Sequence, residues 1–261
     1  MIVIGEAARA AGRRIDVPIQ NGSRMAGKTD WLEAGKDPSL SPNAFLVDLP
    51  PGSVLDTHFH RENQFQLFVK GEGRIGPHPI RPITVHYAGA FTGYGPLAAG
   101  PLGVTYFTIR PVYDTGAFYL PHARGEMVRG PKRALHSEPV TPLEPEALHG
   151  LRAPQLLDLI ALQPDSIAAR LLRLPPHASY TDLDPDGTGG QFLVVMNGSI
   201  LHGERALGSL DMIFVSADEP AFRLEAREAG AEVVLLQLPM KATAYVGRGW
   251  SSVAPAAGDD L

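Results

Sequence analysis

The 261-residue sequence contains no cysteine. Disulfides, thiolate nucleophiles and cysteine-ligated zinc sites are therefore excluded together. No run of about eighteen apolar residues, the length that a membrane-spanning helix needs, is present. Excess basic charge is missing as well: the net charge is −5, so nucleic acid is not an expected partner. The first residues, MIVIGEAARAAGRR, lack a basic start followed by an apolar core, so we expect no secretory signal and a cytoplasmic location.

Glycine and proline, by contrast, are abundant. The chain has 28 glycines and 24 prolines, about a fifth of all residues against roughly 12% in average proteins. They separate short runs rich in β-branched, aromatic and aliphatic residues, such as AFLVDL, QFQLFV and VTYFTI. Many short strands between turn residues are typical of a sandwich or barrel. Helical patterns are limited to residues 5–14 and 144–161, so we expect a mostly β protein with few short helices.

Three segments of the first half recur in order in the second half. Each pair shares an apolar strand followed by a characteristic turn, Leu-Pro-Pro in the first pair and a glycine six residues after a glutamine in the second. The aligned pairs are 44–60 with 169–185, 64–73 with 191–200, and 103–111 with 231–239. The offset is nearly constant and close to half the chain, so the sequence predicts two copies of one β unit.

The most unusual stretch of the chain is HFHRENQ, which begins at His58. Side chains alternate between the two faces of a strand, so His58 and His60 point to the same side. A three-residue turn then returns the chain, which lets Gln64 face them, and alternation places Gln66 and Phe68 on the same inward face. Two imidazoles on one face can share a metal ion, a substrate anion or only water.

This stretch resembles the first motif of the cupin superfamily, which is glycine, five residues, His-x-His, three or four residues, glutamate, six residues, glycine. Gly52, His58, His60, Gln64 and Gly71 match every spacing, with glutamine in place of the usual glutamate. The resemblance extends over both halves of the chain. It implies an all-β bicupin with tandem double-stranded β-helix barrels of the jelly-roll kind and a degenerate second barrel.

The resemblance and the repeat together predict five segments. They are an N-terminal extension (1–39), a first cupin barrel (40–112), a linker with a short helix (113–165), a second cupin barrel (166–240) and a C-terminal tail (241–261).

In cupin enzymes, two histidines, a glutamate and a third histidine bind a divalent metal, so the resemblance implies that His58, His60 and Gln64 bind Fe, Mn, Ni or Zn. Gln64 would contribute a neutral amide oxygen in place of a carboxylate, which weakens the hold on a dication. The family's third histidine position falls near Gly93, where no histidine stands. The further candidates for this ligand are Tyr94 and His86. Glu62 is a candidate ligand only in place of Gln64, and its alternative is a solvated turn residue.

The second half lacks the histidine pair, because Leu183 and Pro185, or Pro185 and Gly187, stand in its place. We therefore expect no metal in the second barrel. The residues expected to line a substrate pocket in the first barrel are Gln66, Phe68, Tyr87, Phe91 and Tyr106. For the aromatic residues among them, and for Tyr94, an ordinary place in the barrel core is the alternative.

Two functions remain open. The first is a metal-dependent enzyme that acts on a small organic molecule in the N-terminal barrel, by a dioxygenase-, decarboxylase- or isomerase-like reaction. The second is a metal-free bicupin that binds a small ligand or serves as an assembly unit. Under either hypothesis we expect a homodimer, because short barrels with apolar outer faces bury those faces against a neighbour.

Overall fold

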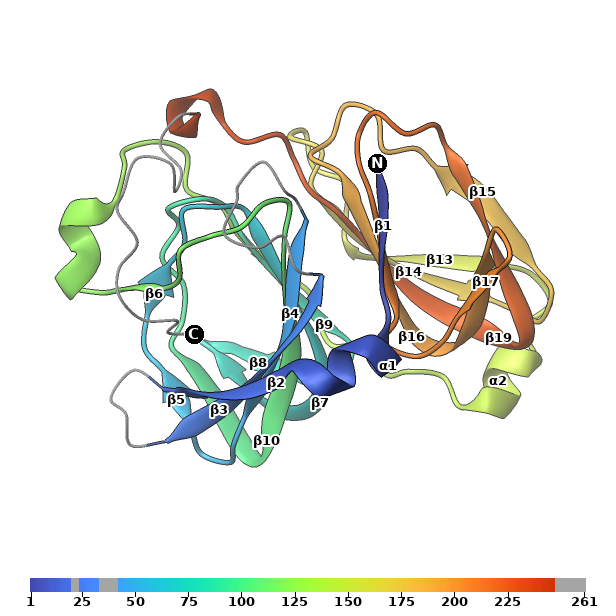
Figure 1. Ribbon diagram of the computed structural model, residues 1–261, viewed down its shortest axis with the longest axis horizontal. Helices are drawn as coiled ribbons and strands as arrows, with labels where there is room; N and C mark the ends of the chain where they lie inside the picture. Colours follow the sequence, from blue (N-terminus) through green and yellow to red (C-terminus); the bar gives the residue numbers. More distant parts are fainter. Residues whose placement is uncertain (20–23, 33–41, 247–261) are drawn as a thin grey trace. The chain divides into compact units, whose positions relative to one another are not determined.

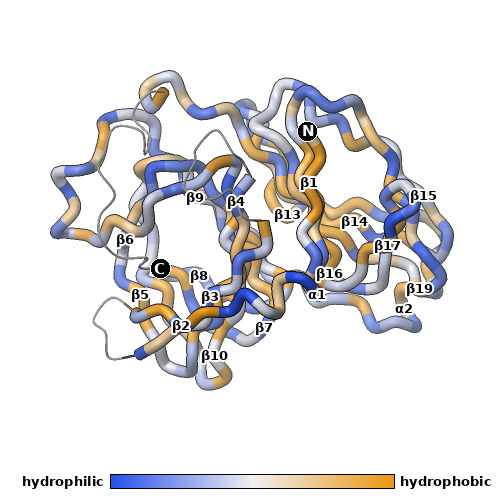
Figure 2. The backbone as a smooth tube through the Cα atoms, in the orientation of Figure 1, coloured by the Kyte–Doolittle hydropathy of each residue, from blue (hydrophilic) through white to orange (hydrophobic). Residues whose placement is uncertain are grey.

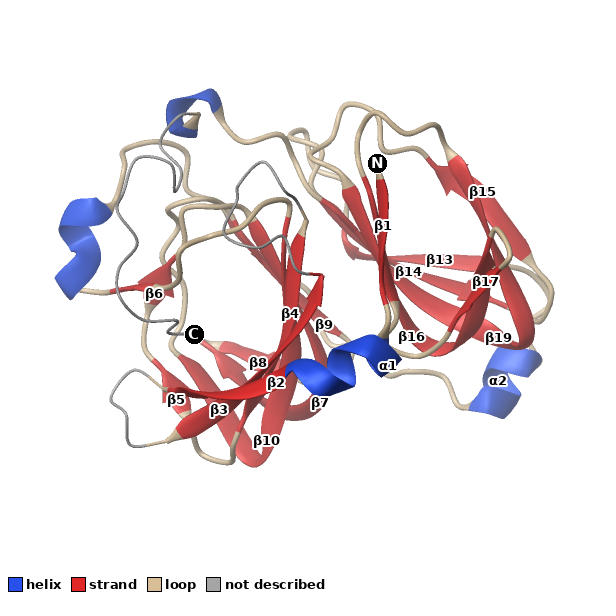
Figure 3. Cartoon of the chain, viewed as in Figure 1, coloured by secondary structure: helices blue, strands red, loops and turns tan. Residues whose placement is uncertain are grey.

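The structure is a computed structural model that describes residues 1–19, 24–32 and 42–246 (Figure 1). The chain forms two compact units. The N-terminal barrel unit contains residues 11–139 and the chain from Lys241 on, and the C-terminal barrel unit contains residues 1–10 and 140–240. Strands make up most of the regular structure in both units, as the short β-prone runs predict (Figure 3). No helix in the described parts of the chain is long and apolar enough to cross a membrane.

The N-terminal barrel unit contains one large antiparallel sheet and a small one. The large sheet has the order β12-β9-β7-β10-β4-β3-β2, with β5 paired to β10 and β8 to β7, and β6 pairs separately with β11. The bounds are β2 (Arg14–Pro18), β3 (Met25–Leu32), β4 (Asn43–Leu49), β5 (Val54–Leu55), β6 (His58–Phe59), β7 (Gln64–Ile75), β8 (His78–Ile80), β9 (Thr84–Ala88), β10 (Leu97–Arg110), β11 (Phe118–Tyr119) and β12 (Ala134–His136).

The C-terminal barrel unit has an antiparallel sheet of the order β1-β18-β16-β19-β14-β13, with β15 paired to β19 and β17 to β16. The bounds are β1 (Ile2–Gly5), β13 (Gln155–Ile160), β14 (Ala168–Leu174), β15 (Ser179–Leu183), β16 (Gln191–His202), β17 (Arg205–Leu207), β18 (Met212–Val215) and β19 (Phe222–Gln237). The short helices of the two units are α1 (Ala7–Ala10), η1 (Ala11–Arg13), η2 (His122–Glu126), α2 (Pro145–His149) and η3 (Thr243–Tyr245).

The two units have the same strand order, which confirms the duplication that the repeat predicts. Strands β9-β7-β10-β4-β3 of one unit correspond to β18-β16-β19-β14-β13 of the other. A pair of glycines marks the same irregularity in each copy. A Cβ atom on Gly71 would lie 2.1 Å from the carbonyl oxygen of Gly103, and one on Gly198 would lie 2.0 Å from that of Gly230. All four glycines have a positive φ, so each copy needs glycine both for space and for conformation.

The glycine pairs correct one detail of the sequence alignment. Gly103 corresponds to Gly230, so Val104 corresponds to Ala231, and each pairs with the equivalent glycine of the neighbouring strand. The third repeat block therefore lies one residue away from the alignment 103–111 with 231–239. A slip of one residue exchanges the two faces of a strand, so it changes which residues are matched inside the barrels.

Each unit has an apolar core on the inner face of its sheet. In the N-terminal barrel unit this core includes Val47, Phe68 and Tyr106, and the rings of Phe68 and Tyr106 are 5.2 Å apart. In the C-terminal barrel unit it includes Leu172 and Val233. The hydropathy of β14 and β1 in Figure 2 agrees with this, since both strands consist largely of hydrophobic residues. Strand alternation thus explains the inward faces of both barrels.

The divisions of the structure differ from the five segments expected from the sequence. The 1–39 extension supplies β1 to the C-terminal barrel unit, and β2 and β3 to the N-terminal one. The 113–165 linker contains β11, β12 and β13, and residues 155–160, expected to be helical, form β13. Because α2 ends at His149, just before Gly150, and Pro154 precedes the next segment, the helix does not continue.

A second apolar cluster lies near β6 in the N-terminal barrel unit. It contains Phe59, Phe91 and Tyr245, with Phe118 and Leu120 packed against it. The residues come from β6, from the loop after β9, from the segment around β11, and from the chain beyond Lys241. These segments therefore pack together beside the two histidines of the motif.

Candidate functional site

The structure brings His58, His60, Gln64 and Tyr94 together inside the N-terminal barrel unit. His58 lies on β6 and Gln64 begins β7, as the alternation of the motif predicts. His58 also forms a β-bridge with Tyr94, so the backbone itself holds the two side by side. The imidazole rings of His58 and His60 are 5.3 Å apart. All four side chains are buried, with exposed fractions of 6% or less.

A directional chain of hydrogen bonds connects these side chains. The Nε of Arg110 donates to Oε1 of Gln64 over 3.0 Å, and Nε2 of Gln64 donates to the hydroxyl oxygen of Tyr94 over 2.6 Å. The Tyr94 hydroxyl lies 2.9 Å from Nε2 of His58. Since that oxygen already accepts from the amide, its proton points to the imidazole. Burial raises the pKa of Tyr94, so the hydroxyl keeps its proton.

The tautomer of His58 follows from its other nitrogen. Nδ1 lies 2.6 Å from the carbonyl oxygen of Asp56, which only accepts, so Nδ1 carries the proton and Nε2 has the lone pair. Burial, then the nearby His60, lowers the pKa of His58 to about 3. His58 is therefore neutral and accepts the proton of Tyr94 at its inward nitrogen.

His60 is oriented by a buried carboxylate. Its Nδ1 lies 2.7 Å from Oδ2 of Asp114 and 2.9 Å from the carbonyl oxygen of Gly116, so Nδ1 donates and Nε2 keeps the lone pair. Nη2 of Arg110 lies 3.1 Å from Nδ1 and 3.3 Å from Nε2 of His60. Because Nη2 is almost equally far from both ring nitrogens, the guanidinium lies against the His60 ring, within hydrogen-bond distance of Nε2.

The charges of this group are balanced. Burial disfavours the ionised form of Asp114, but the hydrogen bond from His60 and the charge of Arg110 outweigh it and hold the pKa below its usual value. Burial and the Arg110 charge lower the pKa of His60 against the opposing effect of Asp114. The guanidinium of Arg110 and the carboxylate of Asp114 thus carry opposite charges on either side of the neutral His60.

The side chains present do not fit a divalent metal as they are arranged. Nε2 of His58 accepts from Tyr94, Nε2 of His60 faces Arg110, and Oε1 of Gln64 accepts from Arg110. Among the residues that the structure describes, no group of three or more His, Cys, Asp or Glu side chains is arranged to hold a metal ion. Gly93, at the family's third histidine position, offers no side chain.

His86 lies on the other side of Tyr94, with ring centroids 5.2 Å apart, and it does not join the hydrogen-bonded chain. It is the register partner of Gln66 on the neighbouring strand. Both ring nitrogens of His86 and Oε1 of Gln66 are buried with no hydrogen-bond partner among the described residues. Burial, then the neighbouring His136 and His78, lower the pKa of His86 to about 3 against the opposing effect of the Leu135 carbonyl, which lies nearby but outside hydrogen-bond geometry; the ring is therefore neutral. Buried polar atoms are nearly always hydrogen-bonded in folded proteins, so these atoms call for a partner beyond the residues that the structure describes.

The remaining residues predicted for the site lie elsewhere. Glu62 is 5% exposed and pairs with Lys241, so the solvated-turn alternative is wrong for it. Burial raises the pKa of Glu62, and Lys241 partly opposes this. Tyr87 pairs with Phe65 on the face of the sheet opposite to Gln66, which its position next to His86 requires. Phe91 belongs to the apolar cluster near β6, whereas Phe68 and Tyr106 lie in the barrel core.

The sequence analysis missed Arg110 and Asp114. The alignment matched Arg110 to an apolar residue, Leu238, whereas the one-residue correction matches it to Gln237. Asp114 lies just beyond β10 in the segment expected to be a linker, and it contacts His60 across 54 positions of sequence. The signal that could have found Arg110 is the glycine pair, which fixes the register of β10.

The C-terminal barrel unit has a contact equivalent to the one between Gln64 and Arg110, but it joins two neutral side chains. Nε2 of Gln191 donates to Oε1 of Gln237 over 3.0 Å, at the positions of Gln64 and Arg110. Leu183, at one of the positions expected to lack histidine, is 1% exposed and lies in the apolar core.

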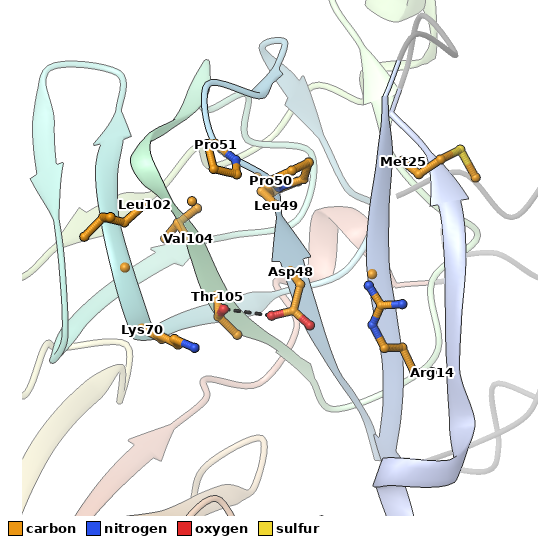
Figure 4. Close-up of a pocket in the computed structure, with 13 residues that line it drawn as sticks. Arg14, Met25, Asp48, Leu49, Pro50, Pro51, Lys70, Leu102, Val104 and Thr105 are labelled. Carbon is orange, nitrogen blue, oxygen red and sulfur yellow. Dashed lines mark hydrogen bonds between the residues drawn. The ribbon is translucent and has the colours of Figure 1, made fainter.

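Two hollows lie on the outer surface of the N-terminal barrel unit. One, of about 290 Å³, has Arg14, Lys70 and the pair Thr105–Asp48 in its lining (Figure 4); the Thr105 hydroxyl donates to Asp48 over 2.7 Å. The other, of about 470 Å³, lies near Arg74 and Glu138. Neither is lined by the inward histidines, so they are separate from the buried group.

Comparison with known proteins agrees with this architecture. No family model matches the sequence, and no curated protein is similar to it in sequence. Solved structures of cupin-fold proteins do match, and the chain has the same fold of two cupin-type barrels.

Three of the similar structures show the range of proteins with this fold. A candidate dioxygenase from Nostoc punctiforme has a TM-score of 0.63 and 11% identity, covering 94% of this chain and 85% of its own. The nickel(II) complex of the bacterial pirin from Escherichia coli has a TM-score of 0.54 and 13% identity, covering 92% and 99%. An 11S globulin from Wrightia tinctoria with an auxin binding site has a TM-score of 0.58 and 11% identity, covering 91% and 83%. Because identities are this low, the likeness concerns the fold alone.

Proposed function

We propose that the N-terminal barrel binds a small, uncharged polar molecule without a metal ion. The observation that carries this proposal is the buried pair Gln66 and His86. Together they present an amide oxygen and the two nitrogens of a neutral imidazole, all without a partner in the described chain. A guest with both a hydrogen-bond donor and an acceptor satisfies such a set, whereas leaving one buried group unpaired costs about 1–3 kcal/mol.

The charge balance of the interior supports an uncharged guest. Arg110 and Asp114 compensate each other, and Glu62 pairs with Lys241. The imidazoles of His58 and His86 are neutral, because their pKa values are lowered to about 3. The side chains that act on the pKa of His86 are other histidines, so a charged ligand beside it would lack an adjacent counter-charge, which is unfavourable at low dielectric.

A crystal structure of the purified protein tests this proposal. We expect a non-protein group within hydrogen-bond distance of Oε1 of Gln66 and of a ring nitrogen of His86. A thermal-shift screen of small uncharged amides, lactams and alcohols should find compounds that raise the Tm of the wild type but not of Gln66→Leu or His86→Leu. The matched control is Gln191→Leu in the C-terminal barrel unit, whose own Oε1 also lacks a partner. Density for water alone, with no compound that separates these variants, would contradict the ligand.

A metal-dependent enzyme is the second candidate, and one observation favours it. His58 and His60 each donate Nδ1–H to a fixed oxygen and turn the lone pair of Nε2 inward, which is the tautomer that metal-binding histidines adopt. A bound metal would act as a Lewis acid on a small organic substrate, in a dioxygenase-, decarboxylase- or isomerase-like reaction. Elemental analysis of protein purified without a metal-affinity tag distinguishes the two candidates, since stoichiometric Fe, Mn, Ni or Zn would favour the enzyme.

A homodimer and a cytoplasmic location stay predictions. Exposed apolar side chains on the N-terminal barrel unit support a partner: Met25 is 48%, Val54 47% and Leu102 80% exposed. Light scattering tests the dimer, and a monodisperse species of 28.0 kDa would contradict it.

A further inference from the structure

We propose that the guanidinium group of Arg110 is the resident cation of the N-terminal barrel, and that His58, His60 and Gln64 are arranged around this side chain in place of a divalent metal. The inference deepens the metal-free part of the proposed function. It does not depend on the identity of the guest near Gln66 and His86, because the two rest on different side chains.

Every inward donor atom of the histidine motif already lies within hydrogen-bond distance of Arg110 or Tyr94. Arg110 takes two of them directly, through Nε to Oε1 of Gln64 at 3.0 Å and through Nη2 beside Nε2 of His60 at 3.3 Å. Tyr94 takes the third, Nε2 of His58, and is itself bound by Gln64. A metal could bind these atoms only after both Arg110 and Tyr94 had moved away.

The charges at this site also disfavour a metal ion. Arg110 is 3% exposed, and the Asp114 side chain that compensates its charge is fully buried. A dication at the motif would add two positive charges beside the guanidinium. Like charges repel strongly in a buried site, and a dication is repelled twice as strongly as a monocation at the same distance. One carboxylate does not offset both cations.

The hydrogen bonds of residue 64 also explain why this residue is a glutamine and not a glutamate. In this network residue 64 must accept a hydrogen bond from Arg110 and donate one to Tyr94, and a carboxamide does both. A glutamate would accept from Arg110 but could not donate to Tyr94. The Tyr94 proton would then have two acceptors, the carboxylate and His58. Glutamine at position 64 is therefore the residue that a guanidinium-centred network requires.

The C-terminal barrel unit provides an internal comparison. The position of Arg110 is taken there by Gln237, which pairs with Gln191 in the same register and over the same 3.0 Å. The fold thus accommodates a neutral glutamine at this place on β19. Arg110→Gln copies that arrangement into the first barrel and removes the cation with little change in packing.

The experiment measures the binding of Ni(II) and Mn(II) by calorimetry, after treatment with a chelator, together with elemental analysis. The proteins are the wild type, Gln64→Glu, Arg110→Gln and the double variant Gln64→Glu/Arg110→Gln. A matched control is Gln191→Glu, which places the same carboxylate in the second barrel. Circular dichroism and Tm of each variant show that it is folded. Arg110→Met, which also removes the charge, replaces Arg110→Gln if that variant does not fold, and Arg110→Lys, which keeps the charge, is a second control.

We expect no stoichiometric metal on the wild type, on Gln64→Glu, on Arg110→Lys or on the Gln191→Glu control. The double variant should bind one equivalent at least about a hundredfold more tightly than the wild type, because it exchanges a cation for an anion at the site. Adding His58→Ala to the double variant should abolish this gain. Stoichiometric metal on the wild type that His58→Ala removes would overturn the inference, and so would a double variant that binds no better than the wild type.

These outcomes are separate from those of the proposed function. A metal-free wild type with a metal-binding double variant supports Arg110 as the resident cation even if no uncharged guest is found. A guest that binds beside His86 in a protein whose wild type also holds metal would support the ligand and reject the role of Arg110.

Discussion

The imidazole of His60 donates its Nδ1 proton to the buried carboxylate of Asp114 over 2.7 Å. This contact does two things at once. It fixes the tautomer of His60, and it places the counter-charge of Arg110 inside the barrel. A neutral residue at position 114 would leave a buried guanidinium without compensation, which is among the costly changes for a folded protein.

Asp114→Asn should therefore lower the free energy of unfolding by about 3 kcal/mol, measured by urea denaturation. Asn keeps an acceptor for His60, so the loss reports the charge. The control is Asp158→Asn, whose carboxylate is 56% exposed and 3.5 Å from Arg170; this change should cost less than about 0.5 kcal/mol. Combining Asp114→Asn with Arg110→Gln should recover part of the loss. Equal small losses in both single variants would contradict the buried charge pair.

Tyr94→Phe should destabilise the protein by about 1–3 kcal/mol, because it leaves Nε2 of His58 and the amide of Gln64 without their shared partner. A double-mutant cycle with Gln64→Met measures the coupling within the network. We expect a coupling energy of at least about 0.5 kcal/mol between positions 64 and 94. Strictly additive effects would show that the hydrogen-bonded chain does not act as a unit.

Stability should fall as the pH drops below about 6.5, because two buried histidines are neutral in the folded protein. His58 and His86 have pKa values lowered to about 3 in the folded protein, against about 6.5 in an unfolded chain. Between these values the unfolded state binds more protons, so stability is complete above about pH 6.5 and declines as the pH falls toward 3. Each histidine should contribute a slope of about 1.4 kcal/mol per pH unit within this window.

Chemical denaturation at several pH values between 4 and 6 checks this slope. His86→Leu should reduce the slope by about one proton, that is, about 1.4 kcal/mol per pH unit. His149→Leu, at an exposed position, is the matched control for the replacement of a histidine by leucine. A wild-type stability that is flat over this range would mean that the two buried imidazoles are protonated in the folded state or open to solvent.

The paired glycines should be equally sensitive in the two barrels. Gly71→Ala and Gly198→Ala each place a methyl group about 2 Å from a carbonyl oxygen, at a positive φ. Each should lower the free energy of unfolding by at least about 2 kcal/mol. Gly125→Ala, where nothing lies within 4 Å, is the control and should change stability little. A neutral Gly198→Ala would show that the two copies do not share this constraint.

Much of the fold could be predicted from the sequence, because it depends on local patterns. The alternating apolar runs, the turn residues and the repeat are enough to predict two barrels with the same strand order. The region 155–160 was mistaken for a helix because its short apolar run, QLLDLI, fits either period. The unit to which β1 and β2 each belong could not be predicted, because it depends on pairing with strands far along the chain.

The candidate site was predicted in part. His58, His60 and Gln64 follow from motif spacing and strand alternation, and Tyr94 from its place beside the family's third histidine position. The hairpin expected from the three-residue turn is not the observed pairing, because β6 pairs with β11 rather than with β7. Arg110 required the register of β10 to within one residue, which an alignment of two divergent copies did not provide. Asp114 required a contact between a loop and a strand that no local pattern encodes. Motif spacing therefore does not predict Arg110 and Asp114, the two residues that determine the charge of the site.

The exchange of chain ends between the units has a consequence for dissecting the protein. Strand β1 belongs to the C-terminal barrel unit, whereas the described residues from Lys241 on belong to the N-terminal one. No single cut therefore separates the barrels. A fragment that stops at Pro139 lacks Lys241 and Tyr245. A fragment that starts at Val140 lacks β1, which pairs with β18. Fusing residues 1–10 behind Met240 through a flexible linker would give the C-terminal barrel as one continuous polypeptide, in a circularly permuted order.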